Sequence, residues 1–299
     1  MTDIRPSKHG VRPSFVVLPA GSWLTILEFV QARFPAVSRE QWCARIARGE
    51  VTHENGEPVT ADTAFVPQQK IYYYRSIENE PRIPFEARVI FQDEYIVVAD
   101  KPHFLPVVPG GRFVRETLLA RLTESLGIDT LAPMHRIDRD TAGLVLFTVQ
   151  PRTRDAYQRL FRERSVEKHY EAIAPFRADL TPPLTRKSRL VESATFMQMH
   201  EIEGAPNAQT QIDLVEQYGE FARYALRPLT GQKHQLRAHM SALGISIAND
   251  PIYPTLRPAA PLDDWSRPLK LLAKQIAFTD PLTGESRVYE SKQSLGWDV

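Results

Sequence analysis

Apolar positions near the N-terminus repeat at helical spacing. Apolar residues recur three and four positions apart from Leu24 to Phe34, and Pro35 interrupts the pattern. We therefore expect a helix here with Ser22 as its N-cap, and a second short helix with Ser38 as its N-cap. The ordered part of the chain is thus expected to begin with two short helices.

A hairpin and a linker are expected to follow these helices. The Asn55-Gly56 pair lies between short strand-like runs, which is typical of a tight hairpin turn. Residues 78–86 hold two prolines and three glutamates, as linkers often do. The sequence therefore predicts a flexible arm over residues 1–15, a small α/β module with its linker over 16–80, and a main domain over 81–299.

The main domain mixes strand-like and helical patterns. Helical periodicity predicts helices over residues 117–126, 153–164 and 233–243. Short apolar runs bounded by turn residues predict strands over 91–100 (two strands and a turn), 143–149, 170–174, 210–215, 222–226, 271–278 and 287–289. The strands and helices do not alternate regularly, so the predicted fold class is α+β.

Composition adds few constraints. The 299 residues are 42% hydrophobic, and Lys plus Arg number 37 against 36 for Asp plus Glu, a net charge of +1. This balance excludes an overall basic coat but allows a local basic groove. Cys43 is the only cysteine, which excludes an internal disulfide and a cysteine-based zinc site and favours the cytosol. The longest apolar runs are too short for a bilayer span, and residues 1–14 lack a secretory signal pattern, so no membrane association is expected.

The densest polar cluster precedes the apolar run at 143–149. Asp138 stands between Arg136 and Arg139, which favours its ionised form. An ionised carboxylate at the end of a rigid strand can act as a nucleophile or stabilise a cation. The alternative is a turn in which Asp138 or Asp140 caps the backbone and the arginines are solvated.

Two stretches are basic although the whole chain is nearly neutral. Residues 222–249 contain no acid and four basic residues: Arg223, Arg227, Lys233 and Arg237. Lys233 and Arg237 are expected on one helix face. Residues 152–168 carry six basic and three acidic residues, a net +3, and lead into Tyr170. Basic stretches beside an aromatic residue suit an RNA backbone and a stacked base, whereas the alternatives are solvated basic faces and a core aromatic. The eight histidines show no zinc-site spacing, so no metal is expected.

Several blocks carry a family resemblance. Residues 135–144 read His-Arg-Ile-Asp-Arg-Asp-Thr-Ala-Gly-Leu, and residues 168–172 read Lys-His-Tyr-Glu-Ala. Residues 229–239 read Leu-Thr-Gly-Gln-Lys-His-Gln-Leu-Arg-Ala-His, with Asn-Asp-Pro-Ile-Tyr at 249–253 and Lys101-Pro102 upstream. In this order they resemble the motifs of the RluA-type RNA pseudouridine synthases. Gln232 replaces the arginine and Asn249 the glycine of those motifs, which bears on RNA specificity more than on the chemistry. The module before residue 80 resembles an S4-type RNA-binding domain.

The resemblance implies both a fold and an activity. The fold is a mixed, mainly antiparallel central sheet with flanking helices and a catalytic cleft. The activity is isomerisation of uridine to pseudouridine in structured RNA (rRNA, tRNA or both), with no cofactor and no obligate protein partner. Asp138 is the implied catalytic carboxylate, Arg237 its basic partner and Tyr170 the residue stacked on the flipped base, while Arg136 fills the space that the base leaves. Further RNA contacts are expected from His135, Arg139, Lys168, Lys233, His234, Gln235 and Lys101.

Two other functions remain open on the sequence. One is a non-catalytic RNA-binding protein of the same fold. The other is a nucleosidase or glycosidase that uses Asp138 with a second carboxylate as general acid. Asp140, two positions from Asp138, is the candidate for such an acid.

The local basic stretches generate a prediction about RNA binding. We expect the binding constant to fall steeply with salt despite the net charge of +1. Each phosphate contact contributes about 0.9 to the log–log slope on duplex RNA and about 0.7 on single strands, because bound counterions are released. A filter-binding series between low and moderate salt measures the slope, and a flat series would contradict the prediction.

Overall fold

The computed structural model describes residues 5–77, 79–193, 197–261 and 263–299, and the chain forms two compact units. The first unit comprises Met1–Glu80 together with Gly111–Arg115 and Ala120–Asp129. The second comprises Pro81–Gly110, Glu116–Leu119 and Thr130–Val299. Among the described residues, no helix combines the length and the apolar character that a membrane crossing requires.

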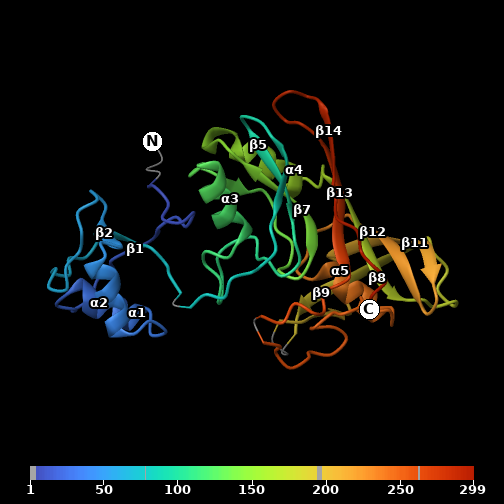
Figure 1. The fold of residues 1–299 in the computed structure, drawn as a ribbon, viewed down its shortest axis with the longest axis horizontal. Coiled ribbons are helices and arrows are strands. Elements are labelled where there is room, and N and C mark those ends of the chain that lie inside the picture. Colours follow the sequence, from blue (N-terminus) through green and yellow to red (C-terminus); the bar gives the residue numbers. More distant parts are fainter. Residues whose placement is uncertain (1–4, 78, 194–196, 262) are drawn as a thin grey trace. The chain divides into compact units, whose positions relative to one another are not determined.

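The N-terminal part of the first unit, up to Glu80, is a small α/β module (blue in Figure 1). Its antiparallel sheet has the order β1 (Ser14–Val17), β3 (Lys70–Tyr73), β2 (Val51–His53). Helices α1 (Ile26–Arg33) and α2 (Arg39–Ala47) contribute to its core, where Phe29, Trp42 and Ile71 are almost wholly buried. Apolar side chains from both helices and the sheet therefore meet in one core.

Capping residues set where the two helices begin. Ser38 accepts a hydrogen bond from the backbone N–H of Gln41, whose side chain accepts one from the N–H of Ser38. This capping box confirms Ser38 as the N-cap of α2. The expectation of Ser22 for α1 is wrong, because the Oγ1 of Thr25 accepts from the N–H of Glu28 and so caps the helix three residues later.

The Asn55-Gly56 turn forms as expected, with Gly56 at a positive φ of 91°. The backbone N–H of His53 donates to the carbonyl of Glu57 across it. The residues after this turn contribute only an isolated bridge, between Thr52 and Pro58. The full strand partner of β2 is instead β3, about twenty residues later.

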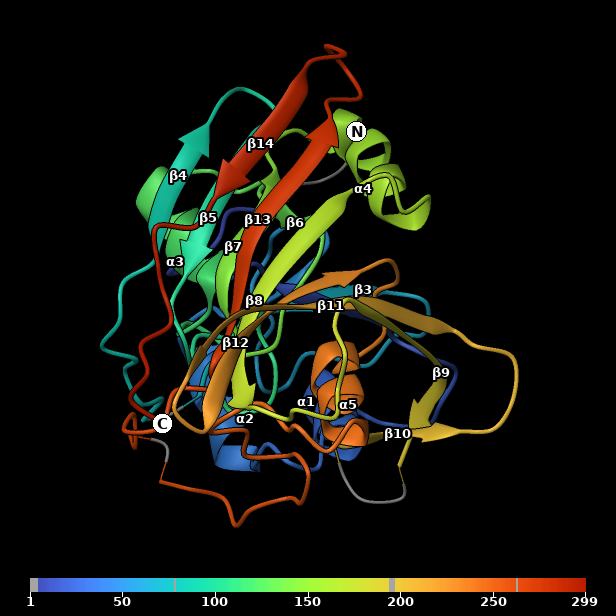
Figure 2. The ribbon, with the colours of Figure 1, turned by 90° about the vertical axis from the view of Figure 1, so that its right-hand side faces the viewer.

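The second unit is built on an 11-stranded, mainly antiparallel sheet (Figure 2). Its main path runs β10-β9-β11-β12-β8-β13-β7-β5-β4, and β14 pairs with β13 and β6 with β7. The pairing of β13 with β7 is parallel. The strands are β4 (Arg88–Gln92), β5 (Ile96–Lys101), β6 (Ala132–Pro133), β7 (Ala142–Thr148), β8 (Glu167–Pro175), β9 (Leu184–Glu192), β10 (Met199–Ile202), β11 (Ala208–Tyr218), β12 (Phe221–Pro228), β13 (Leu271–Thr279) and β14 (Ser286–Glu290).

Helices pack on this sheet through separate apolar clusters. Leu236 and Met240 of α5 (Gln235–Ala242) pack with Ala172 of β8 and Leu226 of β12. Tyr157 of α4 (Arg154–Arg162) packs in another cluster with β5 and β7. A further helix, α3 (Leu118–Leu126), follows β5 in the chain, and from Ala120 onward it belongs to the first unit. Every residue of β7 is buried, which explains its continuous apolar run.

The α+β class and the main strands are thus confirmed, while the strands β6, β9 and β10 of the second unit were missed. Strand β9 shows no apolar pattern, because residues 185–189 are all polar or charged and only Leu190 of the strand is buried. The helix expected from residue 233 begins at Gln235. His234 before it is left-handed, with φ of 51°, so Lys233 lies outside the helix and does not share a face with Arg237.

The close approach of β7 and β13 depends on Gly143. Its φ is 110°, and a Cβ there would lie 2.2 Å from the carbonyl oxygen of Ala273. We expect Gly143→Ala to cost about 2–4 kcal/mol of unfolding free energy, from backbone strain plus the clash. Gly284→Ala is the control, since Gly284 has φ of 75° but no atom within 4 Å of the added Cβ. Equal losses for both variants in urea denaturation would contradict a role for close packing at Gly143.

Candidate active site

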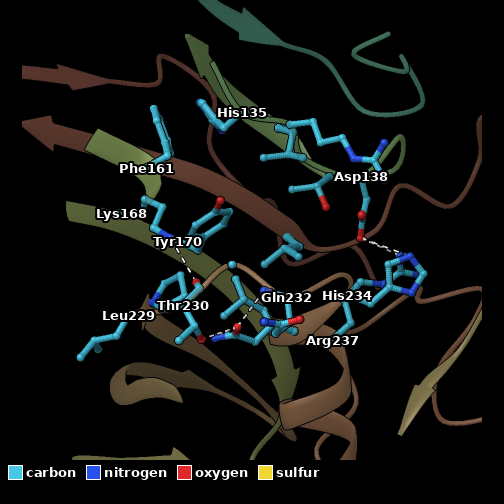
Figure 3. A pocket seen from close by; sticks show the side chains of 18 of the residues that line it. His135, Asp138, Phe161, Lys168, Tyr170, Leu229, Thr230, Gln232, His234 and Arg237 are labelled. Atoms are coloured by element: carbon cyan, nitrogen blue, oxygen red, sulfur yellow. Dashed lines mark hydrogen bonds and ion pairs between the residues drawn. The ribbon is translucent and has the colours of Figure 1, made fainter. Parts of the chain in front are cut away.

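A cavity of about 420 Å³ opens at the sheet of the second unit (Figure 3). Its walls come from the loop before β7, from α4 and β8, and from the segment that joins β12 to α5. These segments are far apart in the sequence, and the sheet brings them together. The lining residues are His135, Arg136, Ile137, Asp138, Thr141, Phe161, Arg164, Lys168, Tyr170, Pro228, Leu229, Thr230, Gly231, Gln232, His234, Gln235, Leu236, Arg237 and Leu271.

Asp138 and Arg237, ninety-nine positions apart, form an ion pair in this cavity. The Nη1 of Arg237 donates to the Oδ2 of Asp138 at 3.0 Å. The Arg237 side chain is 2% exposed and that of Asp138 is 30% exposed. Within the described part of the chain, no hydrogen bond reaches Oδ1 of Asp138. One carboxylate oxygen is therefore held by the protein and the other remains available to a ligand.

Asp250 completes a buried charge network around Arg237. Its two carboxylate oxygens accept hydrogen bonds from Nε and Nη2 of Arg237 at 2.8 and 2.7 Å. Burial alone would lower the pKa of Arg237, but Asp250 and then Asp138 raise it overall. The guanidinium is thus permanently charged and fixed in a bidentate geometry, and it holds Asp138 in place.

Tyr170 reaches the cavity from β8. Burial raises the pKa of its phenol, and the charge of Asp138 raises it further. The phenol is therefore protonated at neutral pH. Its ring lines the cavity together with the apolar side chains of Leu236 and Leu271. This end of the cavity combines an aromatic ring, an apolar wall and one carboxylate.

The loop that carries Asp138 is held by a buried lysine and a partly buried histidine. The Nζ of Lys101 donates to the carbonyl oxygens of Arg139 and Pro102, both at 3.0 Å, and Nδ1 of His103 lies 2.8 Å from the carbonyl oxygen of Asp140. Burial lowers the pKa of Lys101 to about 7, against the opposing charges of Asp140 and Asp138. Lys101 is wholly buried. The expectation that it contacts RNA is therefore wrong: it supports the loop instead.

Gln235 lines the cavity, and its amide makes hydrogen bonds within the protein. Its Oε1 accepts hydrogen bonds from the Thr230 hydroxyl at 2.6 Å and from the N–H of Gln232 at 3.1 Å. Its Nε2 donates to the carbonyl of Gln209 and to the Thr210 hydroxyl. Its amide is fully used, so Gln235 shapes the segment that lines the cavity.

His234 does lie beside Asp138. Its Nε2 is 3.8 Å from the Oδ2 of Asp138, and its ring meets Tyr253 edge-on at 5.9 Å between centroids. Burial lowers the pKa of His234, while the charge of Asp138 opposes the shift. The left-handed backbone at His234 turns its side chain toward the carboxylate at the start of α5.

The remaining expected residues divide into two groups. His135, Arg136 and Lys168 line the cavity. Lys233 and Arg139 do not line the cavity. Lys233 pairs with Glu192 at 3.1 Å, and Arg139 pairs with Asp140 at 3.0 Å.

Asp250, Phe161 and Arg164 were not expected at the site. Asp250 lies in the Asn-Asp-Pro-Ile-Tyr motif at 249–253. A buried arginine needs acidic partners, and this requirement points to Asp250 as a partner of Arg237. Nothing in the sequence singles out Phe161 or Arg164, except that they lie in a basic, amphipathic segment. Among the described residues, no group of three or more His, Cys, Asp or Glu side chains is arranged to hold a metal ion.

Comparison with known proteins identifies the family. Residues 95–242 match the model of the RNA pseudouridylate synthase family. The chain is 32% identical to the dual-specificity RNA pseudouridine synthase RluA of Pasteurella multocida, over 66% of this chain and 89% of that protein. The chain belongs to the RluA-type RNA pseudouridine synthases. The synthase is also 32% identical to the mitochondrial tRNA pseudouridine(32) synthase of Saccharomyces cerevisiae, over 72% of this chain but only 47% of that protein.

A solved structure agrees with the assignment. Human RNA pseudouridylate synthase domain containing 4 aligns with a TM-score of 0.54 and 25% identity, over 69% of this chain and 88% of the human one. The synthase therefore has the pseudouridine synthase fold and converts uridine to pseudouridine in RNA. This assignment replaces the two alternatives, a non-catalytic RNA-binding protein and a nucleosidase or glycosidase. Asp140, the candidate general acid for a glycosidase, is paired with Arg139.

The buried pair of Asp250 and Arg237 generates a stability prediction. We expect Asp250→Asn to cost about 3 kcal/mol of unfolding free energy, because it removes one charge from a buried network. Asp213→Asn is the control: Asp213 also pairs with an arginine, Arg227, but both are 30% or more exposed, so its loss should stay under about 1 kcal/mol. Chemical denaturation of both variants measures the difference, and similar losses would contradict the network.

Proposed function

We propose that Asp138 is the catalytic carboxylate of the synthase, with Arg237 as its positioning residue and Tyr170 as the residue against which the uracil ring stacks. The observation that carries this proposal is the unequal use of the two Asp138 oxygens. Oδ2 is held by a wholly buried arginine, whereas Oδ1 has no hydrogen-bond partner among the described residues, and Asp138 lines the cavity. Such a carboxylate is preorganised and still reactive.

The reaction breaks the bond between N1 of uracil and C1′ of ribose, turns the base, and joins C5 to C1′. The proton on C5 is lost and N1 gains one, so no atom is added or removed overall. Asp138 stabilises or traps the positive charge that develops on the sugar, as carboxylates do in glycosyl transfer. The raised pKa of Tyr170 favours stacking by a neutral phenol over removal of the C5 proton by a phenolate.

The target base must leave its stack to reach this cavity. Arg136 lines the cavity and is exposed, so we assign it to the space that the base leaves in the RNA. His234 lies beside Asp138, with its Nε2 3.8 Å from Oδ2, and Lys168 adds positive charge to the cavity. We propose these three residues, together with His135, as the RNA-contacting set.

The natural substrate that we propose is structured RNA, either rRNA, tRNA or both, in the cytosol. The names of the relatives support this class, since one is a dual-specificity RNA pseudouridine synthase and another a tRNA pseudouridine(32) synthase. The test is pseudouridine mapping on total RNA from cells with and without the gene. Sites lost with the gene identify the RNA, and loss in neither rRNA nor tRNA would contradict the proposed class.

We also propose that the first unit is an S4-like module that binds RNA. Its helices carry the exposed residues Arg33 and Arg39, and no carboxylate is paired with either among the described residues. Substitution is preferable to deletion of residues 1–80, because Val114 and Ala120 belong to the same unit and pack with Val11. Replacing both arginines by glutamate should raise KM and leave kcat unchanged, because the contact is the same in ground and transition states.

The role of Asp138 generates an activity prediction. We expect Asp138→Asn to lower single-turnover rates at least about a thousand-fold with RNA affinity kept, because the neutral amide can neither attack nor stabilise a cation. Asp140→Asn is the matched control, since Asp140 lies two residues away, pairs with Arg139 and is not a lining residue. Tritium release from C5-labelled uridine RNA measures the rate. Comparable activity in the two variants would overturn the assignment.

A further inference from the structure

The cavity extends well beyond the pair of Asp138 and Arg237. Figure 3 shows His135, Phe161 and Lys168 on one side of the cavity, and Asp138, His234 and Arg237 on the other. A volume of about 420 Å³ falls in the range of pockets that enclose drug-sized ligands. One pyrimidine ring beside Tyr170 would leave much of this space unfilled. The far end therefore has room for a second group.

An aromatic pair forms the wall of that far end. The rings of His135 and Phe161 are stacked, with centroids 4.7 Å apart and planes 19° apart. Nε2 of His135 accepts a hydrogen bond from the backbone N–H of Leu146 at 3.1 Å, so the ring proton of the neutral histidine is on Nδ1. Burial, and then the charge of Lys168, lowers the pKa of His135 to about 3. The pair is thus a neutral platform with one donor of fixed position.

Two cations stand beside this platform without an acidic partner. Burial lowers the pKa of Lys168, and the charge of Arg164 lowers it further. Nζ of Lys168 donates to the carbonyl of Thr230 at 3.1 Å. Among the described residues, no carboxylate pairs with Arg164 or Lys168. Arg162, two positions before Arg164, differs sharply, because it pairs with Asp155 at 2.7 Å and does not line the cavity.

We propose that this end of the cavity is a second nucleotide subsite, which binds the nucleotide next to the target uridine. Its base lies against the His135–Phe161 pair, and its phosphate lies between Arg164 and Lys168. The neutral aromatic wall suits the face of a base. The two cations, which repel each other, suit a phosphate. The proposal rests on the proposed function, in which the other end of the cavity receives the uridine.

With this subsite, the activity of the synthase on a uridine would depend on the nucleotide next to that uridine. A base that stacks on an aromatic side chain contributes about 1–3 kcal/mol, which is enough to rank otherwise similar uridines. The fixed Nδ1–H of His135 can donate to an acceptor atom of the same nucleotide. Phe161 and Arg164 are then specificity-determining residues, which the quoted motifs do not contain.

The first experiment tests whether the effect of changing Phe161 depends on the base next to the target uridine. The probe is the shortest stem-loop transcript that contains the mapped uridine, made intact, with an abasic 5′ neighbour, and with an abasic 3′ neighbour. Wild type and Phe161→Leu, which keeps apolar volume, are compared in single-turnover assays. We expect Phe161→Leu to lower kcat/KM about ten-fold on the intact RNA and less than about two-fold on one abasic RNA. Equal losses on all three RNAs would overturn the proposal, and thermal melting confirms that the variant is folded.

The second experiment tests the phosphate contact. Arg164→Ala should reduce the log–log salt slope of RNA binding by about 0.7, the value for one contact on a single strand. Arg162→Ala is the matched control and should leave the slope unchanged. An unchanged slope in Arg164→Ala would exclude the phosphate contact. If Asp138→Asn were active while Phe161 still coupled to the neighbouring base, the catalytic assignment would fail and the subsite would stand.

Discussion

The geometry of the site depends on a buried arginine shared by two carboxylates. Arg237 is 2% exposed and cannot release its proton, so it requires negative partners inside the protein. Asp250 takes two of its N–H donors and leaves the Nη1 edge for Asp138. Without Asp250, the guanidinium would be free to turn toward Asp138 and bind both oxygens. The second carboxylate therefore helps to keep one oxygen of the first available to a ligand.

The sheet supplies the rigidity that this arrangement requires. Asp138 precedes β7, Tyr170 lies on β8, and Arg237 is on α5, which packs on β8 and β12. The loop before β7 is tied further, because Lys101 and His103 contact two of its carbonyl groups. A buried lysine is a costly support, and its cost fits a loop whose position must be accurate to a fraction of an ångström.

Much of this fold and site could be predicted from the sequence. Continuous apolar runs located β7 and β13, and the motif order brought Asp138, Tyr170 and Arg237 to one site. The sequence did not distinguish polar residues that support the structure from polar residues that bind a ligand. Lys101 and Gln235 have the chemistry of RNA contacts, yet their groups are consumed by carbonyl and hydroxyl partners that lie from one to 38 positions away. Such partners depend on tertiary contacts, which neither periodicity nor spacing encodes.

The place of β13 in the sheet has a consequence for synthesis of the chain. β13 lies between β7 and β8 and pairs with both, although it follows β8 by nearly a hundred residues. Until Leu271–Thr279 has left the ribosome, β7, which follows the loop of Asp138, and β8, which carries Tyr170, lack the partner that joins them, and Leu271 is missing from the cavity wall. A nascent chain therefore carries the motifs of the enzyme long before it has a site. Pairing of this late strand completes the sheet beneath the site, so the cavity is assembled only when nearly the whole chain has been made.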